Sequence, residues 1–167
     1  MGTVLKGKIV KVLGNDIDTD VIIPGKYLTL TKPEELGKHA LEPLIPGFCK
    51  LVKPGADILV AGRNFGCGSS REHAVLALKG AGIRAVIAES FARIFYRNAI
   101  NNGLWVIECP NIVNKVKEGD EVIINLTEGW IQLPTSEKLP IKPVPEEILK
   151  IVKAGGLIPY LRKKVKM

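Results

Sequence analysis

The sequence predicts an α/β fold built on parallel strands. Between residues 57 and 108, three short apolar runs alternate with two segments of helical patterning. Such alternation implies parallel strands joined by helical crossovers. The first crossover opens with a glycine-rich loop at 62–68, and ligands of such sheets bind beyond the carboxyl ends of the strands, where this loop lies. The loop is therefore the predicted centre of function.

The residues before this region predict a strand, a turn and a long connection. Residues 3–13 are rich in β-branched residues, which favours a strand. Residues 14–20 (GNDIDTD) are typical of an Asx-rich turn, and the glycine–glutamate pattern of a calcium-binding EF-hand does not follow. Residues 31–55 carry four prolines. A connection of this length is expected to be functional or to cover a partner.

The regular part begins at residue 57. The predicted elements are strand, helix, strand, helix and strand, at 57–61, 70–80, 84–89, 91–101 and 104–108. Glycines follow both helices, as is common at helix ends. Ser69 with Glu72 three residues later is a capping-box pattern, and Ser90 is the predicted cap of the second helix.

The remaining residues predict antiparallel strands and a last helix. Apolar runs at 121–126 and 130–133 flank a Thr-Glu-Gly turn, which indicates a hairpin. A proline-punctuated stretch leads to a helix at 146–154, which two glycines end. No repeat or change of composition marks a boundary, so residues 1–167 are predicted to form one domain.

Composition narrows the class of protein. The hydrophobic fraction is 46%, and no apolar run approaches the ~18 residues that a bilayer requires. The sequence does not open with a signal-peptide pattern, so a cytoplasmic protein is expected. A single glutamine among many Lys, Glu and Ile residues indicates a thermophilic source.

The net charge of +7 is compatible with a nucleic-acid partner, but the pattern favours a solvated surface. The lysines are scattered, and only residues 162–166 form a basic cluster. Basic and aromatic residues do not interleave as in single-strand binding proteins. An RNA-associated role of the tail stays open as a minor hypothesis, with steep salt-dependent binding as its expected sign.

The three cysteines do not suggest a metal or disulfide site on this chain. Cys49, Cys67 and Cys109 are far apart and form no CxxC pair. A disulfide framework, zinc site or iron–sulfur ligand set is therefore not expected. Cys67 lies in the glycine loop with His73 nearby, which leaves a cysteine nucleophile as a weak alternative.

The glycine loop and the helix start after it have the chemistry of an anion site. A helix start presents free N–H groups and a partial positive charge. Arg71 adds a planar fork that fits a carboxylate or phosphate, and Ser69 and Ser70 place hydroxyls beside it. The simpler interpretation is that Ser69 only caps the helix.

A stand-alone carboxylate- or nucleotide-binding module is the second class of function. Residues 66–71 are similar to a dinucleotide fingerprint. Arg71, however, stands where the fingerprint needs a third glycine for close helix–strand packing. The binding-module hypothesis predicts ligand binding by the isolated chain that Arg71→Ala removes.

Three motifs in order resemble the aconitase family. Residues 65–74 (FGCGSSREHA) are similar to the signature of its swivelling C-terminal domain, and residues 16–22 and 90–95 fall where the family has its other motifs. Length and motif order resemble the free-standing small subunits of the 3-isopropylmalate dehydratase branch almost end to end. The resemblance implies a three-layer β/β/α swivelling domain with a mainly parallel sheet.

The resemblance also implies a hydro-lyase subunit that is inactive alone. A separate large subunit is expected to carry a [4Fe-4S] cluster, and no metal or cofactor is expected on this chain. The family reaction removes water from a hydroxy acid and adds it back at the neighbouring carbon, with one iron as Lewis acid on the hydroxyl. In this branch it interconverts 2- and 3-isopropylmalate through 2-isopropylmaleate, in leucine biosynthesis.

The matched motifs imply roles for individual residues. Ser69 corresponds to the base that takes a proton from carbon. Arg71 corresponds to the arginine that holds a substrate carboxylate and, with the helix start, stabilises the serine alkoxide. Ser70 is expected to add hydrogen bonds to the substrate. The mouth of the site and the large-subunit contact are expected to be shaped by Asp18, Thr19 and Asp20.

Four further residues are expected to bind substrate: Tyr27, Leu28, Thr29 and Leu30. Homoaconitase-like relatives place an arginine directly after the leucine, to hold an extra carboxylate. Thr29 carries no charge, and a third carboxylate left unpaired is costly. The segment therefore predicts 3-isopropylmalate, with citraconate or a methyl-substituted malate as close competitors and homoaconitate as an alternative. The simpler interpretation is that Thr29 and Leu30 only pack in a loop.

Overall fold

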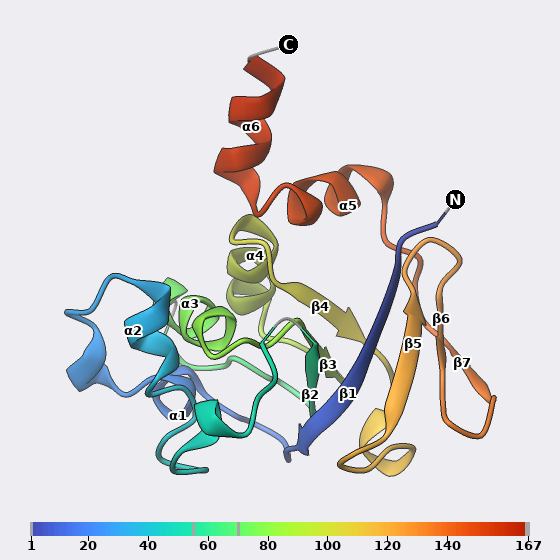
Figure 1. The fold of residues 1–167 in the computed structure, drawn as a ribbon, viewed down its shortest axis with the longest axis horizontal. Helices are drawn as coiled ribbons and strands as arrows, with labels where there is room; N and C mark the ends of the chain where they lie inside the picture. The colour runs from blue at the N-terminus through green and yellow to red at the C-terminus, as the bar shows by residue number, and fades with distance from the viewer. Residues whose placement is uncertain (1, 55, 70, 166–167) are drawn as a thin grey trace.

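The computed structural model describes residues 2–54, 56–69 and 71–165 around one seven-stranded sheet (Figure 1). The strand order is β4-β3-β2-β1-β5-β6-β7. The strands are β1 Val4–Val12, β2 Asp57–Ala61, β3 Ala85–Ala88, β4 Trp105–Glu108, β5 Glu121–Asn125, β6 Trp130–Gln132 and β7 Lys138–Pro140. Strands β1 to β4 pair in parallel, and β5 to β7 join them in antiparallel pairing. The predicted α/β class and the hairpin are confirmed, and the sheet is mixed rather than mainly parallel.

Helices cover one side of the parallel strands, as Figure 1 shows. They are α1 Thr19–Ile22, α2 Pro33–Gly37, α3 Glu72–Gly80, α4 Arg93–Asn101, α5 Glu146–Lys153 and α6 Leu157–Val165. Short 3₁₀ turns lie at Gly25–Tyr27, Phe48–Lys50 and Ile112–Asn114. The sequence patterns did not predict α1, α2 or α6. Among the described residues, none of the helices is long and apolar enough to cross a membrane.

Two hydrophobic cores lie on opposite faces of the sheet. Successive side chains of a strand alternate between its faces, so in β2 Leu59 enters one core and Ile58 the other. The first core is closed by helices, for example by Leu78 of α3. The second is closed by the antiparallel strands, through Ile124 and Ile131. The sheet therefore curls over its own face, which gives the expected β/β/α layers.

The connection between α1 and β2 packs largely on the chain itself. Helix α2 crosses α3 so closely that a Cβ on Gly37 would lie 2.2 Å from the carbonyl carbon of Gly80. Leu36 and Phe48 are buried in the first core. The inward-facing residues of this long connection thus complete the fold.

Both predicted serine caps are wrong. Helix α3 begins at Glu72 with Arg71 as its N-cap, and α4 begins one residue after its N-cap, Ala92. The Ser90 hydroxyl instead accepts a hydrogen bond from the backbone of Asn64, at 2.8 Å. Both N-cap residues are extended, and before α4 the backbone of Ala92 donates to Phe65 O of the glycine loop at 2.9 Å. Ser69 is thereby left free of a capping role.

Candidate active site

Two loops are joined by hydrogen bonds at the carboxyl edge of the parallel strands. The loop after β2 lies against the loop after β1. Gly66 N donates to Ile17 O and Thr19 N donates to Cys67 O, both at 2.8 Å. These main-chain bonds set the position of the side chains that follow in each loop. Segments 48 or more residues apart in sequence thus form one edge.

Two glycines of the loop have positive φ and close neighbours. Gly66 has φ +83°, and a Cβ there would lie 2.2 Å from the Phe95 ring. Gly68 has φ +99°, and its Cβ would lie 3.3 Å from Thr19 Oγ1. Side chains rarely adopt this conformation. The loop therefore needs glycine at both positions to bring Ser69 to the threonine.

The hydroxyl of Ser69 meets the hydroxyl of Thr19, with 3.2 Å between the two oxygens. Ser69 is exposed, whereas Thr19 is only 2% exposed. Thr19 is the first residue of α1, and the Asp18 carboxylate caps that helix by accepting from Val21 N at 3.0 Å. A buried, fixed hydroxyl is therefore aimed at an exposed one.

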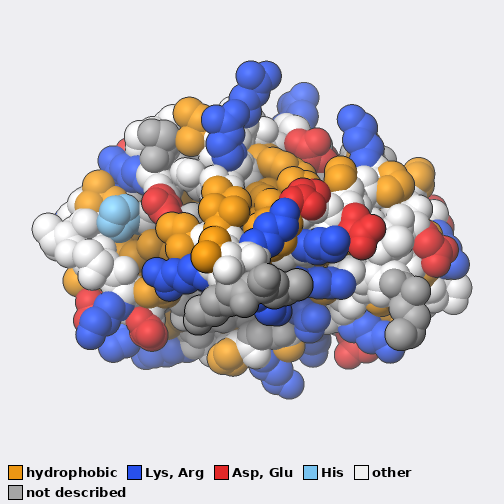
Figure 2. Space-filling view, turned by 90° about the horizontal axis from the view of Figure 1, so that it is seen from above, with side chains coloured by type: hydrophobic (Ala, Val, Ile, Leu, Met, Phe, Trp, Pro, Cys, Tyr) orange, Lys and Arg blue, Asp and Glu red, His pale blue; other side chains and the backbone are white. Residues whose placement is uncertain are grey.

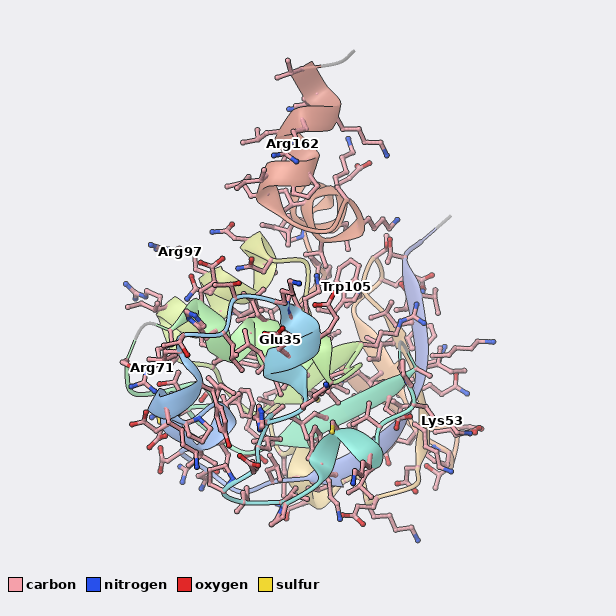
Figure 3. The ribbon with its side chains drawn as sticks, turned by 60° about the vertical axis from the view of Figure 1, so that its left-hand side comes forward. Glu35, Lys53, Arg71, Arg97, Trp105 and Arg162 are labelled. Carbon is pink, nitrogen blue, oxygen red and sulfur yellow. The ribbon has the colours of Figure 1, made fainter. Side chains whose placement is uncertain are left out.

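Arg71 lies at the same edge, beside the loop that follows β1 (Figure 3). Its Nη1 donates to the carboxylate of Asp20 and, at 3.5 Å, to Ile23 O. Nη2 faces Gly25, where a Cβ would lie 3.8 Å away. Among the described residues, neither Nη2 nor Nε has a hydrogen-bond partner. One edge of the guanidinium fork is therefore available to an anion.

The three aspartates after β1 have three different tasks. Asp16 accepts from Asn64 Nδ2 at 3.0 Å, Asp18 caps α1, and Asp20 pairs with Arg71. An Asx-rich turn was predicted here; its last two residues instead open α1, with the Asp18 carboxylate as the N-cap. Within the described ranges, no group of three or more His, Cys, Asp or Glu residues is arranged to hold a metal.

Cys67 is poorly suited to nucleophilic chemistry. Burial raises the pKa of its thiol, and the carboxylates of Asp18 and Asp16 raise it further. A reactive cysteine needs the opposite shift. Cys49 and Cys109 are free thiols in other parts of the fold, and burial raises the pKa of Cys109 to about 11. These three residues do not form a ligand set for an iron–sulfur cluster.

The segment expected to select the substrate, residues 27–30, packs against the connection that follows it. Tyr27 stacks on His39 with ring centroids 3.8 Å apart, and its hydroxyl donates to Glu42 at 2.7 Å. Leu30 packs against the first core, whereas Thr29 is exposed. This favours the packing interpretation for Leu30 and leaves Thr29 open to a ligand.

Sequence reasoning missed both partners of Tyr27, because a loop gives no periodicity from which to pair residues 12 and 15 positions apart. Leu28 is half-buried and continues this segment. Ser70, expected to bind substrate, lies outside the described residues. Arg71 lies against the residues just before this segment, at Ile23 and Gly25.

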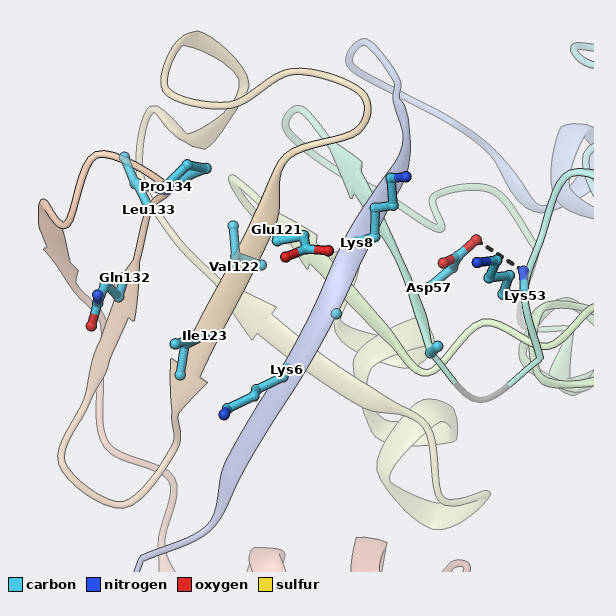
Figure 4. Close-up of a pocket in the computed structure, with 12 residues that line it drawn as sticks. Lys6, Lys8, Lys53, Asp57, Glu121, Val122, Ile123, Gln132, Leu133 and Pro134 are labelled. Atoms are coloured by element: carbon cyan, nitrogen blue, oxygen red, sulfur yellow. Dashed lines mark hydrogen bonds between the residues drawn. The ribbon is translucent and has the colours of Figure 1, made fainter.

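A large cavity lies elsewhere. It has a volume of about 710 Å³ on the face of β1, β5 and β6 that no helix covers (Figure 4). Lys6, Lys8 and Glu121 line it, as does Asp57, whose carboxylate accepts from Lys53 N at 2.9 Å. None of the predicted site residues that the structure describes lines this cavity. The site with Ser69 is instead an open edge of the molecule.

Comparison with known proteins identifies the family. Residues 3–112 match the family described as the aconitase C-terminal domain. The chain is 58% identical to the isopropylmalate/citramalate isomerase small subunit of Methanocaldococcus jannaschii, over 99% of this chain and 98% of that protein. It is 52% identical to the 3-isopropylmalate dehydratase small subunit of Halothermothrix orenii, over 97% of this chain and 98% of that protein.

A solved structure extends the likeness to three dimensions. The crystal structure of a 3-isopropylmalate dehydratase chain from Methanocaldococcus jannaschii superposes with a TM-score of 0.88 at 46% identity. The superposition covers 97% of this chain and 95% of that one. The chain therefore belongs to the aconitase C-terminal domain family, among the small subunits of 3-isopropylmalate dehydratase.

Proposed function

We propose that this chain works with an iron–sulfur large subunit to interconvert 2- and 3-isopropylmalate through 2-isopropylmaleate. A small subunit implies a large-subunit partner. The observation that carries the proposal is the group of side chains at the carboxyl edge of the sheet. There an exposed serine hydroxyl meets a buried threonine hydroxyl beside a partly free arginine fork. This site is open to solvent on one side, as a site completed by a partner requires.

Ser69 is the proposed base. Its oxygen takes the proton from the carbon next to the one that bears the hydroxyl; the hydroxyl then leaves and a double bond forms. Water then adds back with its hydroxyl on the carbon that lost the proton, which gives the isomer. An alkoxide must be stabilised to serve in this way, and the hydroxyl of Thr19, 3.2 Å away, is placed to donate to it. Arg71 supplies positive charge and binds a substrate carboxylate through the free edge of its fork.

The iron–sulfur cluster that activates the leaving hydroxyl is proposed to belong to the large subunit. The described residues of this chain do not gather three metal-ligating side chains. What this chain supplies is the base, the carboxylate-binding arginine and the walls of the pocket. The three free thiols also favour a reducing compartment, and a cytoplasmic location is proposed on that ground.

The substrate proposal depends on a segment without charge. Thr29 is exposed next to Leu28, and neither side chain can neutralise a third carboxylate. An isopropyl group suits such a surface. A methyl group suits it as well, and the relative from Methanocaldococcus jannaschii is named for citramalate in addition to isopropylmalate. Methyl-substituted malates are therefore the second candidate substrates.

An anaerobic assay tests the base assignment. The chain is mixed with the cluster-loaded large subunit from the same source, and the double bond of 2-isopropylmaleate is followed by ultraviolet absorbance. We expect turnover that Ser69→Ala lowers by about a thousandfold or more, the scale of losing a central catalytic group. Thr135→Ala removes an exposed hydroxyl in the turn after β6 and is the matched control. Full activity of Ser69→Ala would refute the assignment.

The selectivity argument has its own test. Wild type is expected to convert 2-isopropylmaleate and citraconate but not cis-homoaconitate or cis-aconitate. Thr29→Arg is expected to gain cis-homoaconitate, because the new cation pairs the extra carboxylate. Thr31→Arg makes the same change two residues further on, also at an exposed position. Equal gains from both variants, or turnover of cis-homoaconitate by wild type, would refute a selective role of Thr29.

A further inference from the structure

Helix α6 projects from the body of the molecule (Figures 1 and 3). None of its nine residues is buried. It is attached to α5 along one side, where Tyr160 donates to Glu147 at 2.7 Å and Lys164 Nζ lies 3.9 Å from the same carboxylate. A helix of this length is marginal in water unless tertiary contacts support it. Helix α6 therefore has one supported side and one side that is bare.

The bare side is apolar. Ile158, Leu161 and Val165 are 63%, 47% and 86% exposed, and their spacing of three and four residues places them on one face. Arg162 and Lys163 follow in the same helix and add positive charge. Figure 2 looks onto this end of the molecule and shows hydrophobic side chains among Lys and Arg. Three large apolar side chains in one stripe are typical of an interaction surface.

A groove leads from this stripe along α3 toward Glu72. A cavity of about 480 Å³ lies between the outer face of α3, the end of α4 and the start of α6. Glu72, Leu76 and Lys79 line it from α3, and Leu157 and Ile158 line it from α6. Glu72 directly follows the site arginine in sequence. The cavity therefore extends along α3 from Glu72, next to the site arginine, to Ile158 of the α6 stripe.

We propose that the apolar face of α6 and the α3 groove form a docking surface for the large subunit. The inference rests on the proposed function, since the partner that closes the site is the one placed to continue along α3. The cations of α6 call for an acidic border on that partner.

A second copy of the chain fits less well. The cations of two α6 helices would repel each other, and nine residues fall far short of the roughly 20–30 residues a side of a stable interface. As an extension of the contact at the site, in contrast, α6 need not hold the complex by itself.

Subunit titration tests the docking surface. Activity is measured against increasing large subunit, which gives an apparent Kd and a kcat at saturation. Leu161→Glu and Ile158→Glu are expected to raise the apparent Kd by about 10- to 100-fold, the worth of one buried apolar side chain. The kcat at saturation is expected to stay within twofold. Leu51→Glu, at a residue 51% exposed in the connection before β2, is the matched control.

Charge-reversal variants and amide hydrogen exchange test the docking surface independently of the apolar substitutions. Lys163→Glu is expected to weaken association more than Lys117→Glu, which makes the same change in the turn before β5. Amide hydrogen exchange of residues 157–165 is expected to slow in the complex of the two wild-type subunits.

Each other outcome has a definite meaning. Absence of any active complex with wild type would overturn the proposed function itself. An active wild-type complex whose apparent Kd is unchanged by Leu161→Glu, or is raised equally by Leu51→Glu, would overturn the docking surface alone. Self-association of the isolated chain in sedimentation, abolished by Leu161→Glu, would assign the stripe to a second copy instead.

Discussion

Ser69 depends, in the proposed mechanism, on a residue 50 positions away in sequence. A serine hydroxyl is a weak base at neutral pH, so its alkoxide needs a nearby donor. Thr19 is buried and cannot exchange its hydroxyl contacts for water. Its hydroxyl is therefore a positioning group with one exposed partner. This pairing gives Thr19 a more specific task than shaping the mouth of the site.

Replacement of Thr19 separates its hydroxyl from its volume. Thr19→Val keeps the shape but removes the donor, and we expect kcat to fall about tenfold, the scale of one hydrogen bond. The ascending limb of the pH–rate profile, along which Ser69 loses its proton, is expected to move to higher pH, because the alkoxide of Ser69 loses a donor. Thr19→Ser keeps the hydroxyl and should stay within about threefold of wild type. Equal losses in both variants, with an unmoved profile, would indicate a packing role only.

Arg71 is expected to act through the geometry of its fork. Arg71→Lys keeps the charge but loses bidentate binding. We expect KM for 2-isopropylmaleate to rise about 10- to 100-fold, in line with loss of one charged hydrogen bond. Arg97→Lys makes the same change at an exposed arginine of α4, labelled in Figure 3, and should leave KM unchanged. A fall in kcat of Arg71→Lys without a change in KM would contradict carboxylate binding by Arg71.

At the level of elements, the sequence predicted the strands better than the helices. Six strands were predicted from apolar or alternating runs between turn residues. Strand β7, Lys138–Pro140, was missed because it has only three residues, one of them charged and one a proline. Helix α2 has only five residues, and α6 starts after two glycines with Pro159 in its first turn. Neither offers a buried stripe long enough to detect. The predicted serine caps failed because α3 and α4 begin two or more residues further on, after the N-caps Arg71 and Ala92.

The site was predictable where residues act through local motifs. Ser69 and Arg71 lie in one matched run of ten residues, and their placement at the carboxyl edge follows from the parallel strands. Glu42 and His39 were not predictable, because their partner is reached across an irregular connection. The pairing of Thr19 with Ser69 likewise exists only once two loops meet.

The contact of Tyr27 with Glu42 predicts a pH-dependent loop. The hydrogen bond from Tyr27 lowers the pKa of Glu42, and the same bond raises the pKa of Tyr27. Because the pKa of Glu42 is lowered in the folded chain, its stabilisation is complete above the ordinary carboxyl pKa. It is lost as the pH falls through the pKa of Glu42 in the folded chain. Because the pKa of Tyr27 is raised, its stabilisation is complete below the ordinary phenol pKa and is lost as the pH rises through the pKa of Tyr27 in the folded chain. The contact is therefore complete between about pH 4.3 and about pH 10.

Hydrogen exchange measures this contact directly. At pH 7, Tyr27→Phe is expected to speed exchange of residues 24–30 several-fold, corrected for intrinsic rates. The difference from wild type is expected to shrink as the pH is lowered and Glu42 takes up a proton. Tyr160→Phe removes a similar tyrosine–glutamate bond from α6 and should leave residues 24–30 unaffected. A difference that persists undiminished at low pH would argue against the role of the carboxylate.

At the scale of the molecule, one sheet belongs to both cores. Each central strand sends alternate side chains to the helix-covered core and to the core closed by β5 to β7. Loss of either core would expose one face of the same strands. The parallel strands carry the site at their carboxyl edge. The antiparallel strands β5 to β7 close the core on the face of the sheet that the helices do not cover. We therefore propose that the chain unfolds as one unit, in line with the expectation of a single domain.

Core truncations on the two faces test this proposal. Leu78→Ala removes a fully buried side chain from the first core, and Ile124→Ala removes one from the second. Each is expected to cost ~2–5 kcal/mol. For a chain of this size the loss corresponds to a fall in Tm of about 5–15 °C. Calorimetry should show one transition in wild type and in both variants, shifted in each by a similar amount. Two transitions, each moved by only one of the substitutions, would mean that the layers fold separately and that the shared strands do not couple them.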